Sequence, residues 1–83
     1  LSHYAPRLPL RLNAGDVAPD EALLAFGPRP LVGAGALWSL SPMGDLTETA
    51  ARLFAGLRWL DAEGARLSLR GIAAMRVPED GLG

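Results

Sequence analysis

The side chains with potential for acid–base chemistry or metal binding are one histidine and two acidic pairs. His3 is the single histidine, and an imidazole can act as a general base or a cation ligand. No Asp or Glu lies near it in sequence, so a residue with only local hydrogen bonds is the favoured interpretation. Adjacent carboxylates can hold Mg²⁺, but at the ends of helices and strands they are usually solvated. The acidic pairs are Asp61 with Glu63 and Glu79 with Asp80. We therefore expect no catalytic residue and no metal site in this chain.

Two glycine-containing stretches could be taken for phosphate-binding loops. Gly33-Ala34-Gly35 precedes a strand, whereas the dinucleotide fingerprint follows a strand and opens a helix, so we interpret it as a backbone turn. Residues 41–44, Ser-Pro-Met-Gly, do precede a helix N-terminus, where anions can bind. Asp45 already supplies a carboxylate there, which would repel phosphate. We therefore expect a self-capped helix and no phosphate site.

Charge and composition limit the classes of partner. All eight basic residues are arginines, and the formal net charge is −1, which gives no general attraction to nucleic acid or to an anionic membrane. Four arginines near predicted strand ends could still meet an acidic partner or tRNA: Arg7, Arg11, Arg70 and Arg76. The absence of cysteine excludes disulfides and fits a reducing cytoplasm. No apolar run approaches the ~20 residues that a membrane span requires. We expect no direct nucleic-acid binding and no membrane contact.

The element that must position the polar residues is a helix predicted over residues 46–62. Asp45 can accept hydrogen bonds at its start, and Glu48 can reach back to Asp45 to complete a capping box. Glu48 and Arg52 stand four apart in the favourable acid-first order. Gly64 predicts the end of the helix. The apolar residues fall in one stripe: Leu46, Ala50, Leu53, Phe54, Leu57 and Leu60.

Trp59 lies outside that stripe, on the side that carries Glu48 and Arg52. One interpretation is burial under a neighbouring segment. The other is a contact point with another domain or subunit, because Trp is a favoured interface anchor. The sequence leaves both open.

Four apolar stretches predict short strands in the order β-β-β-α-β. They are residues 8–12, 22–26, 36–40 and 71–77. The first two connections are shorter than the dozen or so residues that a parallel pair normally needs. Either loops serve as crossovers in a parallel sheet, or some pairing is antiparallel. Residues 22–26 are apolar on both faces, and one long helix can cover only one face. We therefore expect an uncovered sheet face that drives homo-oligomerisation or meets another domain.

Three motifs resemble the C-terminal ("Sua-five") domain of the YrdC/Sua-five family of threonylcarbamoyl-AMP synthases. Residues 39–61 read Ser-Leu-Ser-Pro-x-Gly-Asp-Leu and then Ala-Ala-x-Leu-Phe-x-x-Leu-Arg-x-Leu-Asp. Residues 3–6, His-Tyr-Ala-Pro, are similar to the family's interdomain linker, and residues 77–83, Val-Pro-Glu-x-Gly-Leu-Gly, to the motif before its last helix. Ser2 stands where Arg is usual, and Ser39 where Asn is common. The resemblance implies a small Rossmann-like α/β fold, a pared-down α/β/α sandwich with a mostly parallel four-stranded sheet.

The resemblance also implies a division of labour. Residues 1–7 would be the remnant of a linker, and residues 8–83 a single accessory domain whose YrdC-like catalytic partner domain is absent from this chain. In the family the linker folds over the pocket that binds ATP, threonine and bicarbonate, so His3 and Tyr4 are expected to contact the nucleotide or hold the lid. ATP with Mg²⁺ would belong to the parent enzyme.

The function implied is an accessory or regulatory role in an ATP-dependent L-threonylcarbamoyladenylate synthase that serves tRNA N6-threonylcarbamoyladenosine modification in the cytoplasm. The alternative is a stand-alone protein-interaction module with no enzymatic role. A third candidate is a small nucleotide-binding regulator. By this reasoning the chain alone should not be catalytic.

Overall fold

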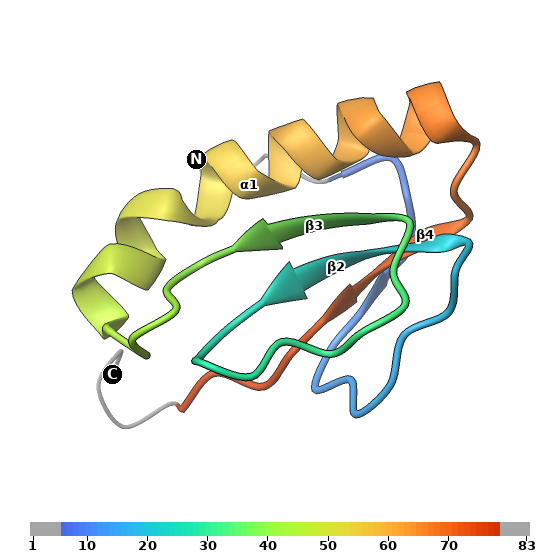
Figure 1. The fold of residues 1–83 in the computed structure, drawn as a ribbon. Helices are drawn as coiled ribbons and strands as arrows, with labels where there is room; N and C mark the ends of the chain where they lie inside the picture. Colours follow the sequence, from blue (N-terminus) through green and yellow to red (C-terminus); the bar gives the residue numbers. More distant parts are fainter. Residues whose placement is uncertain (1–5, 79–83) are drawn as a thin grey trace.

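The computed structural model describes residues 6–78, which form a four-stranded sheet and one long helix (Figure 1). The elements are β1 (Leu10–Arg11), β2 (Glu21–Ala25), β3 (Ala36–Ser39), α1 (Leu46–Leu67) and β4 (Gly71–Ala74). The strand order is β1-β4-β2-β3, and each neighbouring pair is parallel. The predicted small Rossmann-like α/β fold is confirmed, and the antiparallel alternative is wrong.

The connection from β1 to β2 explains how a short loop can join two parallel strands. The strands β1 and β2 are not neighbours, because β4 lies between them. The loop over residues 12–20 therefore passes across one face of β4, and the Ala14 N–H donates to the Ala74 carbonyl at 2.8 Å. The first and last predicted strands in the sequence are shorter than expected: β1 covers only Leu10–Arg11 instead of residues 8–12, and β4 ends at Ala74 instead of residue 77.

Helix α1 continues past Gly64 and ends at Leu67, so the prediction of an end at Gly64 is wrong. Ser68 caps the helix in the left-handed region with φ 58°, and the Leu69 N–H closes the last turn on the Gly64 carbonyl at 2.8 Å. A Cβ on Gly64 would overlap the Leu8 side chain. The missing side chain at Gly64 thus serves packing, and the helix is stopped four residues later by the backbone of Ser68.

The apolar stripe faces the sheet at Leu57 and Leu60, which are buried, whereas Ala50 is exposed. A Cβ on Gly56 would overlap the ring of Trp38, so the helix approaches β3 closely at this point. Small and polar residues complete the buried side of the helix: Thr49, Gly56, Asp61 and Gly64. Hydropathy alone therefore marks only part of the face that packs.

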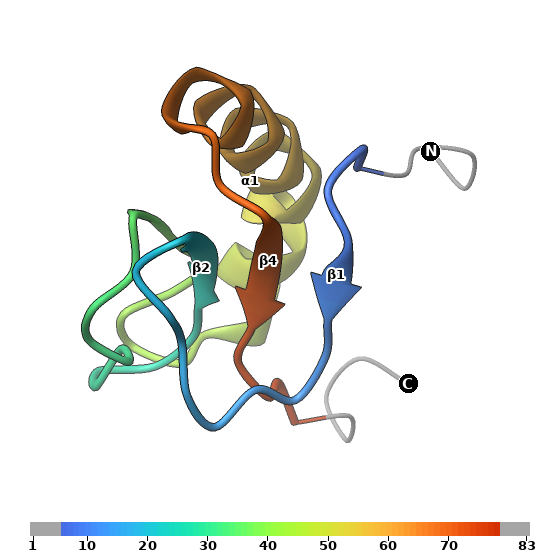
Figure 2. The ribbon, with the colours of Figure 1, turned by 90° about the vertical axis from the view of Figure 1, so that its right-hand side faces the viewer.

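Both faces of the central strands are covered, so the prediction of an uncovered sheet face is wrong. On one side α1 packs over a core that includes Leu24, Leu40, Leu60 and Ile72. On the other side Leu23, Ala25 and Ala73 are buried beneath side chains of the loops over residues 12–20 and 26–35: Ala14, Val17, Leu31 and Ala34. Figure 2 shows the helix on one side of the sheet and the connecting loops on the other. The loops take the place of a second helical layer.

Candidate functional site

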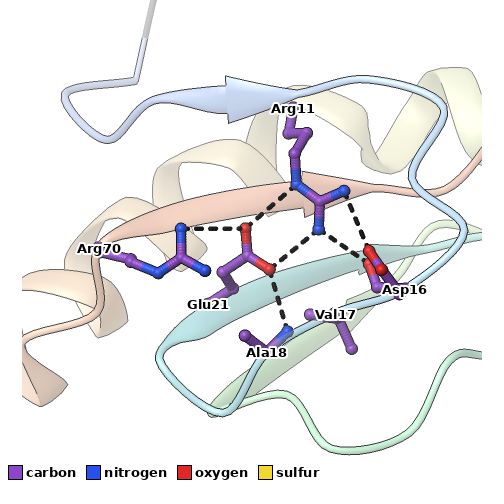
Figure 3. A pocket seen from close by; sticks show the side chains of 6 residues that line it. All are labelled: Arg11, Asp16, Val17, Ala18, Glu21 and Arg70. Carbon is purple, nitrogen blue, oxygen red and sulfur yellow. Dashed lines mark hydrogen bonds and ion pairs between the residues drawn. The ribbon is translucent and has the colours of Figure 1, made fainter.

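A buried carboxylate stands at the start of β2 and gathers charged residues from three segments (Figure 3). Glu21 is 3% exposed. Its Oε1 accepts hydrogen bonds from the Arg11 guanidinium and the Ala18 N–H, both at 3.0 Å, and its Oε2 accepts from Arg11 Nε at 3.3 Å. Arg70, which precedes β4, lies 3.9 Å from Oε2. The cluster borders a polar depression of about 290 Å³.

The electrostatics of this cluster favour a structural role. The hydrogen bonds from Arg11, followed by the bond from the Ala18 N–H, hold the pKa of Glu21 below its ordinary value. The Arg11 guanidinium also donates to the backbone carbonyl of Asp16 and pairs with the Asp16 carboxylate. Arg70 Nε donates to the Asp20 carboxylate at 2.8 Å. Both guanidinium groups are therefore held by carboxylates of their own domain. The arrangement ties the loop over residues 12–20 to the sheet and offers little positive charge to a phosphate or to tRNA.

The sequence had grouped four arginines near strand ends, and the structure brings together only Arg11 and Arg70. Arg7 instead lies against Asp61 on α1, and Arg76 follows β4 at the end opposite to Arg70. Sequence reasoning missed Glu21, which sits at the boundary between a loop and an apolar run. Its signal was an acidic residue, preceded by Asp20, directly before an apolar run that is buried on both faces.

The start of α1 is capped as predicted, but only by half of the predicted capping box. Asp45 Oδ1 accepts from the N–H of Thr47 at 2.9 Å and of Glu48 at 3.4 Å. The prediction that Glu48 accepts a hydrogen bond from the Asp45 N–H is wrong, because this N–H donates to Ser41 Oγ at 2.9 Å. Ser41 is fully buried and so fixes the turn before the helix. The turn closes on its own side chains, as expected of a self-capped end.

Trp59 is 41% exposed and leans on Trp38 of β3, with ring centroids 5.7 Å apart and tilted by 43°. The Arg52 guanidinium lies 4.4 Å above the Trp38 ring, and its Nε donates to the Ser39 carbonyl at 2.9 Å. Arg52 thus packs on β3 and shields this edge strand of the sheet. The sequence spacing predicts Glu48 as its partner, but the contacts of Arg52 are with Trp38 and Ser39. Trp59 is half-covered by its own domain, and its role as an interface anchor stays a prediction.

Asp61 is buried, so the prediction that it is solvated is wrong. Its side chain accepts hydrogen bonds from the backbone N–H groups of Arg7 at 3.0 Å and Leu8 at 3.1 Å, and Arg7 Nε lies 3.5 Å away. Burial alone would raise the pKa of Asp61, but these two N–H donors and the Arg7 charge outweigh it and lower the pKa below its ordinary value. Glu63 instead pairs with Arg66 on the helix surface. Asp61 therefore holds the backbone of a distant segment, whereas Glu63 forms an ion pair within the helix.

An apolar groove of about 390 Å³ runs beside α1 on the helix side of the sheet. The helix packs mainly on β2 and β3, which leaves part of β1 and β4 open. Leu10 is 40% exposed and Leu12 is 68% exposed here. The other apolar residues that line the groove are Leu24, Leu40, Leu53, Leu57, Ala74, Met75 and Val77. Exposed apolar side chains thus lie beside the helix as well as at Leu37 of β3 on the opposite face. Homo-oligomerisation stays a prediction.

Several predicted residues fall outside the described part of the chain: His3 and Tyr4 near the start, and Glu79 and Asp80 near the end. Among residues 6–78, no group of three or more His, Cys, Asp or Glu side chains is placed to hold a metal ion. Within the same range no helix is long and apolar enough to cross a membrane.

Within residues 6–78, the parallel sheet and the helix α1 define a small Rossmann-like domain in which Glu21 and Asp61 hold segments of the domain together. The model of the family "Threonylcarbamoyl-AMP synthase, C-terminal domain" matches residues 1–83. The chain therefore belongs to this family of C-terminal domains, which confirms the resemblance. A search of curated proteins and a search of solved structures each returned no match.

Proposed function

We propose that this chain is the accessory domain of an ATP-dependent threonylcarbamoyl-AMP synthase and that it holds the linker to a YrdC-like catalytic domain without doing chemistry itself. Family membership supports the association with the synthase. The observation that carries the accessory role is the contact of Asp61 with the backbone of Arg7 and Leu8, at the end of the segment that resembles the linker. The reaction would supply the activated intermediate for modification of adenosine 37 of tRNA in the cytoplasm.

We place ATP and Mg²⁺ on the catalytic domain, because the charged cluster around Glu21 does not suit them. A nucleotide needs cationic groups that are free to meet its phosphates. Arg11 and Arg70 are instead engaged by Glu21, Asp16 and Asp20. The carboxylates of this cluster are engaged by the same two arginines, and Asp61 and Glu63 are engaged by Arg7 and Arg66. His3 and Tyr4 would reach the nucleotide from the linker in the intact enzyme.

The test compares three proteins: the parent enzyme, the parent truncated before Leu8, and the 83-residue chain. Formation of threonylcarbamoyl-AMP from ATP, threonine and bicarbonate is followed by chromatography. We expect turnover by the parent, clearly reduced turnover by the truncated enzyme, and none by the chain alone. Equal activity of the parent and the truncated enzyme would refute the accessory role and favour an interaction module without enzymatic function. Turnover by the chain alone, abolished by substitutions within it, would show that the domain is itself catalytic.

A further inference from the structure

The first described residues are attached to the domain in two different ways. From Pro9 onward the sheet holds the chain, because the Pro9 carbonyl accepts a hydrogen bond from the Ile72 N–H at 2.8 Å. Before Pro9 the backbone N–H groups of Arg7 and Leu8 both donate to Asp61. The segment that enters the domain is therefore tied to α1 before it reaches β1.

The geometry at Asp61 is that of a two-point clamp. Oδ2 accepts from the Arg7 N–H at 3.0 Å, and Oδ1 accepts from the Leu8 N–H at 3.1 Å. Two bonds from consecutive peptide groups to one carboxylate fix the direction of the backbone as well as its distance from the helix. Asp61 is itself 8% exposed, so water competes weakly for these bonds.

Packing reinforces the clamp one turn further along the helix. The Leu8 side chain lies in the space left by Gly64, where a Cβ would overlap it, and it packs against the core beneath α1. A hollow of about 260 Å³ at the same place is lined by Arg7, Leu8, Asp61 and Ala65. Among the described residues, the charged side chain that faces Asp61 is Arg7, at 3.5 Å. The attachment thus combines a buried carboxylate with a side chain that is seated in a gap on the helix.

We propose that Asp61 is a positioning residue that anchors the end of the interdomain linker on α1 and so sets the direction in which the preceding residues leave the domain. This inference deepens the proposed function and rests on it for its catalytic consequence. The bonds go to backbone N–H groups, so the anchor constrains the path of the chain whatever side chains the linker carries.

The anchor is tested first in the 83-residue chain, by amide hydrogen exchange measured with NMR. Asp61→Asn removes the charge and leaves one acceptor oxygen where there were two. We expect exchange at Arg7 and Leu8 to become at least about tenfold faster, with exchange in β2 and β4 changed far less. Glu63→Gln is the matched control on the same helix and should leave both amides as in the wild type. Wild-type exchange rates at Arg7 and Leu8 in the Asp61→Asn variant would overturn the anchor.

A titration of the wild type decides the question even if the variant fails to fold. The amide proton shifts of Arg7 and Leu8 should follow a single curve, with a midpoint below the ordinary Asp value of 3.8. Amide shifts that do not respond together as the pH falls through this range would overturn the anchor.

The catalytic consequence is tested in the parent synthase with the same two variants. Because the proposed function has His3 and Tyr4 reach the nucleotide from this linker, Asp61→Asn should raise the KM for ATP about fivefold or more while kcat changes by less than about twofold. Glu63→Gln should change neither constant. A fall in kcat and in melting temperature with an unaltered KM would show a structural role only and would overturn the positioning role. A wild-type parent that makes no threonylcarbamoyl-AMP would refute the proposed function, and the exchange result would still decide the anchor.

Discussion

Two leucines that are register partners on the loop side of the sheet provide a sharp test of how that side is covered. Leu23 of β2 is paired with Leu37 of β3, but Leu23 is 0% exposed whereas Leu37 is 42% exposed. Replacing each by Ala removes the same atoms from neighbouring strands. The comparison therefore isolates the contribution of the loops that cover Leu23.

The expected difference follows from burial. Three carbon atoms at about 0.8 kcal/mol each give roughly 2.4 kcal/mol of lost transfer free energy, and a closed cavity adds to this, so Leu23→Ala should destabilise by about 3–4 kcal/mol. Leu37 is only partly covered and would leave no closed cavity, so Leu37→Ala should cost about 1–1.5 kcal/mol.

Urea unfolding followed by the fluorescence of Trp38 and Trp59 measures both variants. With a slope of about 1 kcal/mol per molar urea, as expected for a small domain, the midpoints should fall by about 3 M and about 1 M. If Leu23→Ala is already unfolded without urea, Leu23→Val and Leu37→Val provide the same comparison with a smaller loss in the free energy of unfolding. Equal losses within each pair would show that the loops do not seal this face, and would refute the two-sided core.

Three further predictions concern the helix cap, the buried carboxylates and the linker. Asp45→Ala should lower stability by about 1 kcal/mol and Asp45→Asn by much less, since Asn also caps; equal losses in urea would show that the cap bonds contribute little. Folding lowers the pKa values of Glu21 and Asp61 below their ordinary values of 4.5 and 3.8. The ionised carboxylates therefore stabilise the folded state above these ordinary values, and this contribution is lost as the pH falls through the lower pKa values of the folded state. Urea midpoints should therefore drop below about pH 4, and less steeply in Glu21→Gln; equal slopes would contradict this. In the parent, His3→Ala or Tyr4→Ala should lower synthase activity without changing the melting of this domain, and normal activity of both variants would reduce the segment to a spacer.

The sequence by itself determined the features that depend on neighbours within a turn or on the alternation of side chains. Asp45 caps the helix because its acceptor and the N–H groups it serves are two and three residues apart. The apolar runs located all four strands, and their double-sided burial is real in β2, whose residues are all buried. The ends of β1 and β4 differ from the predicted ones because pairing, and not composition, decides where a ladder stops.

Only the tertiary structure decided what the glycines, the acidic residues and the loops do. Gly64 ends nothing, because its lack of a side chain makes room for Leu8. Asp61 and Glu63 share a residue type and a helix, yet Asp61 serves backbone groups 53 and 54 residues away in sequence. Glu21 accepts hydrogen bonds from Arg11 and from Ala18 in the loop that crosses β4. A buried charge needs partners, and the fold supplies them from distant segments. The spacing of these segments along the chain follows no periodic pattern, so the sequence does not predict which residues will pair.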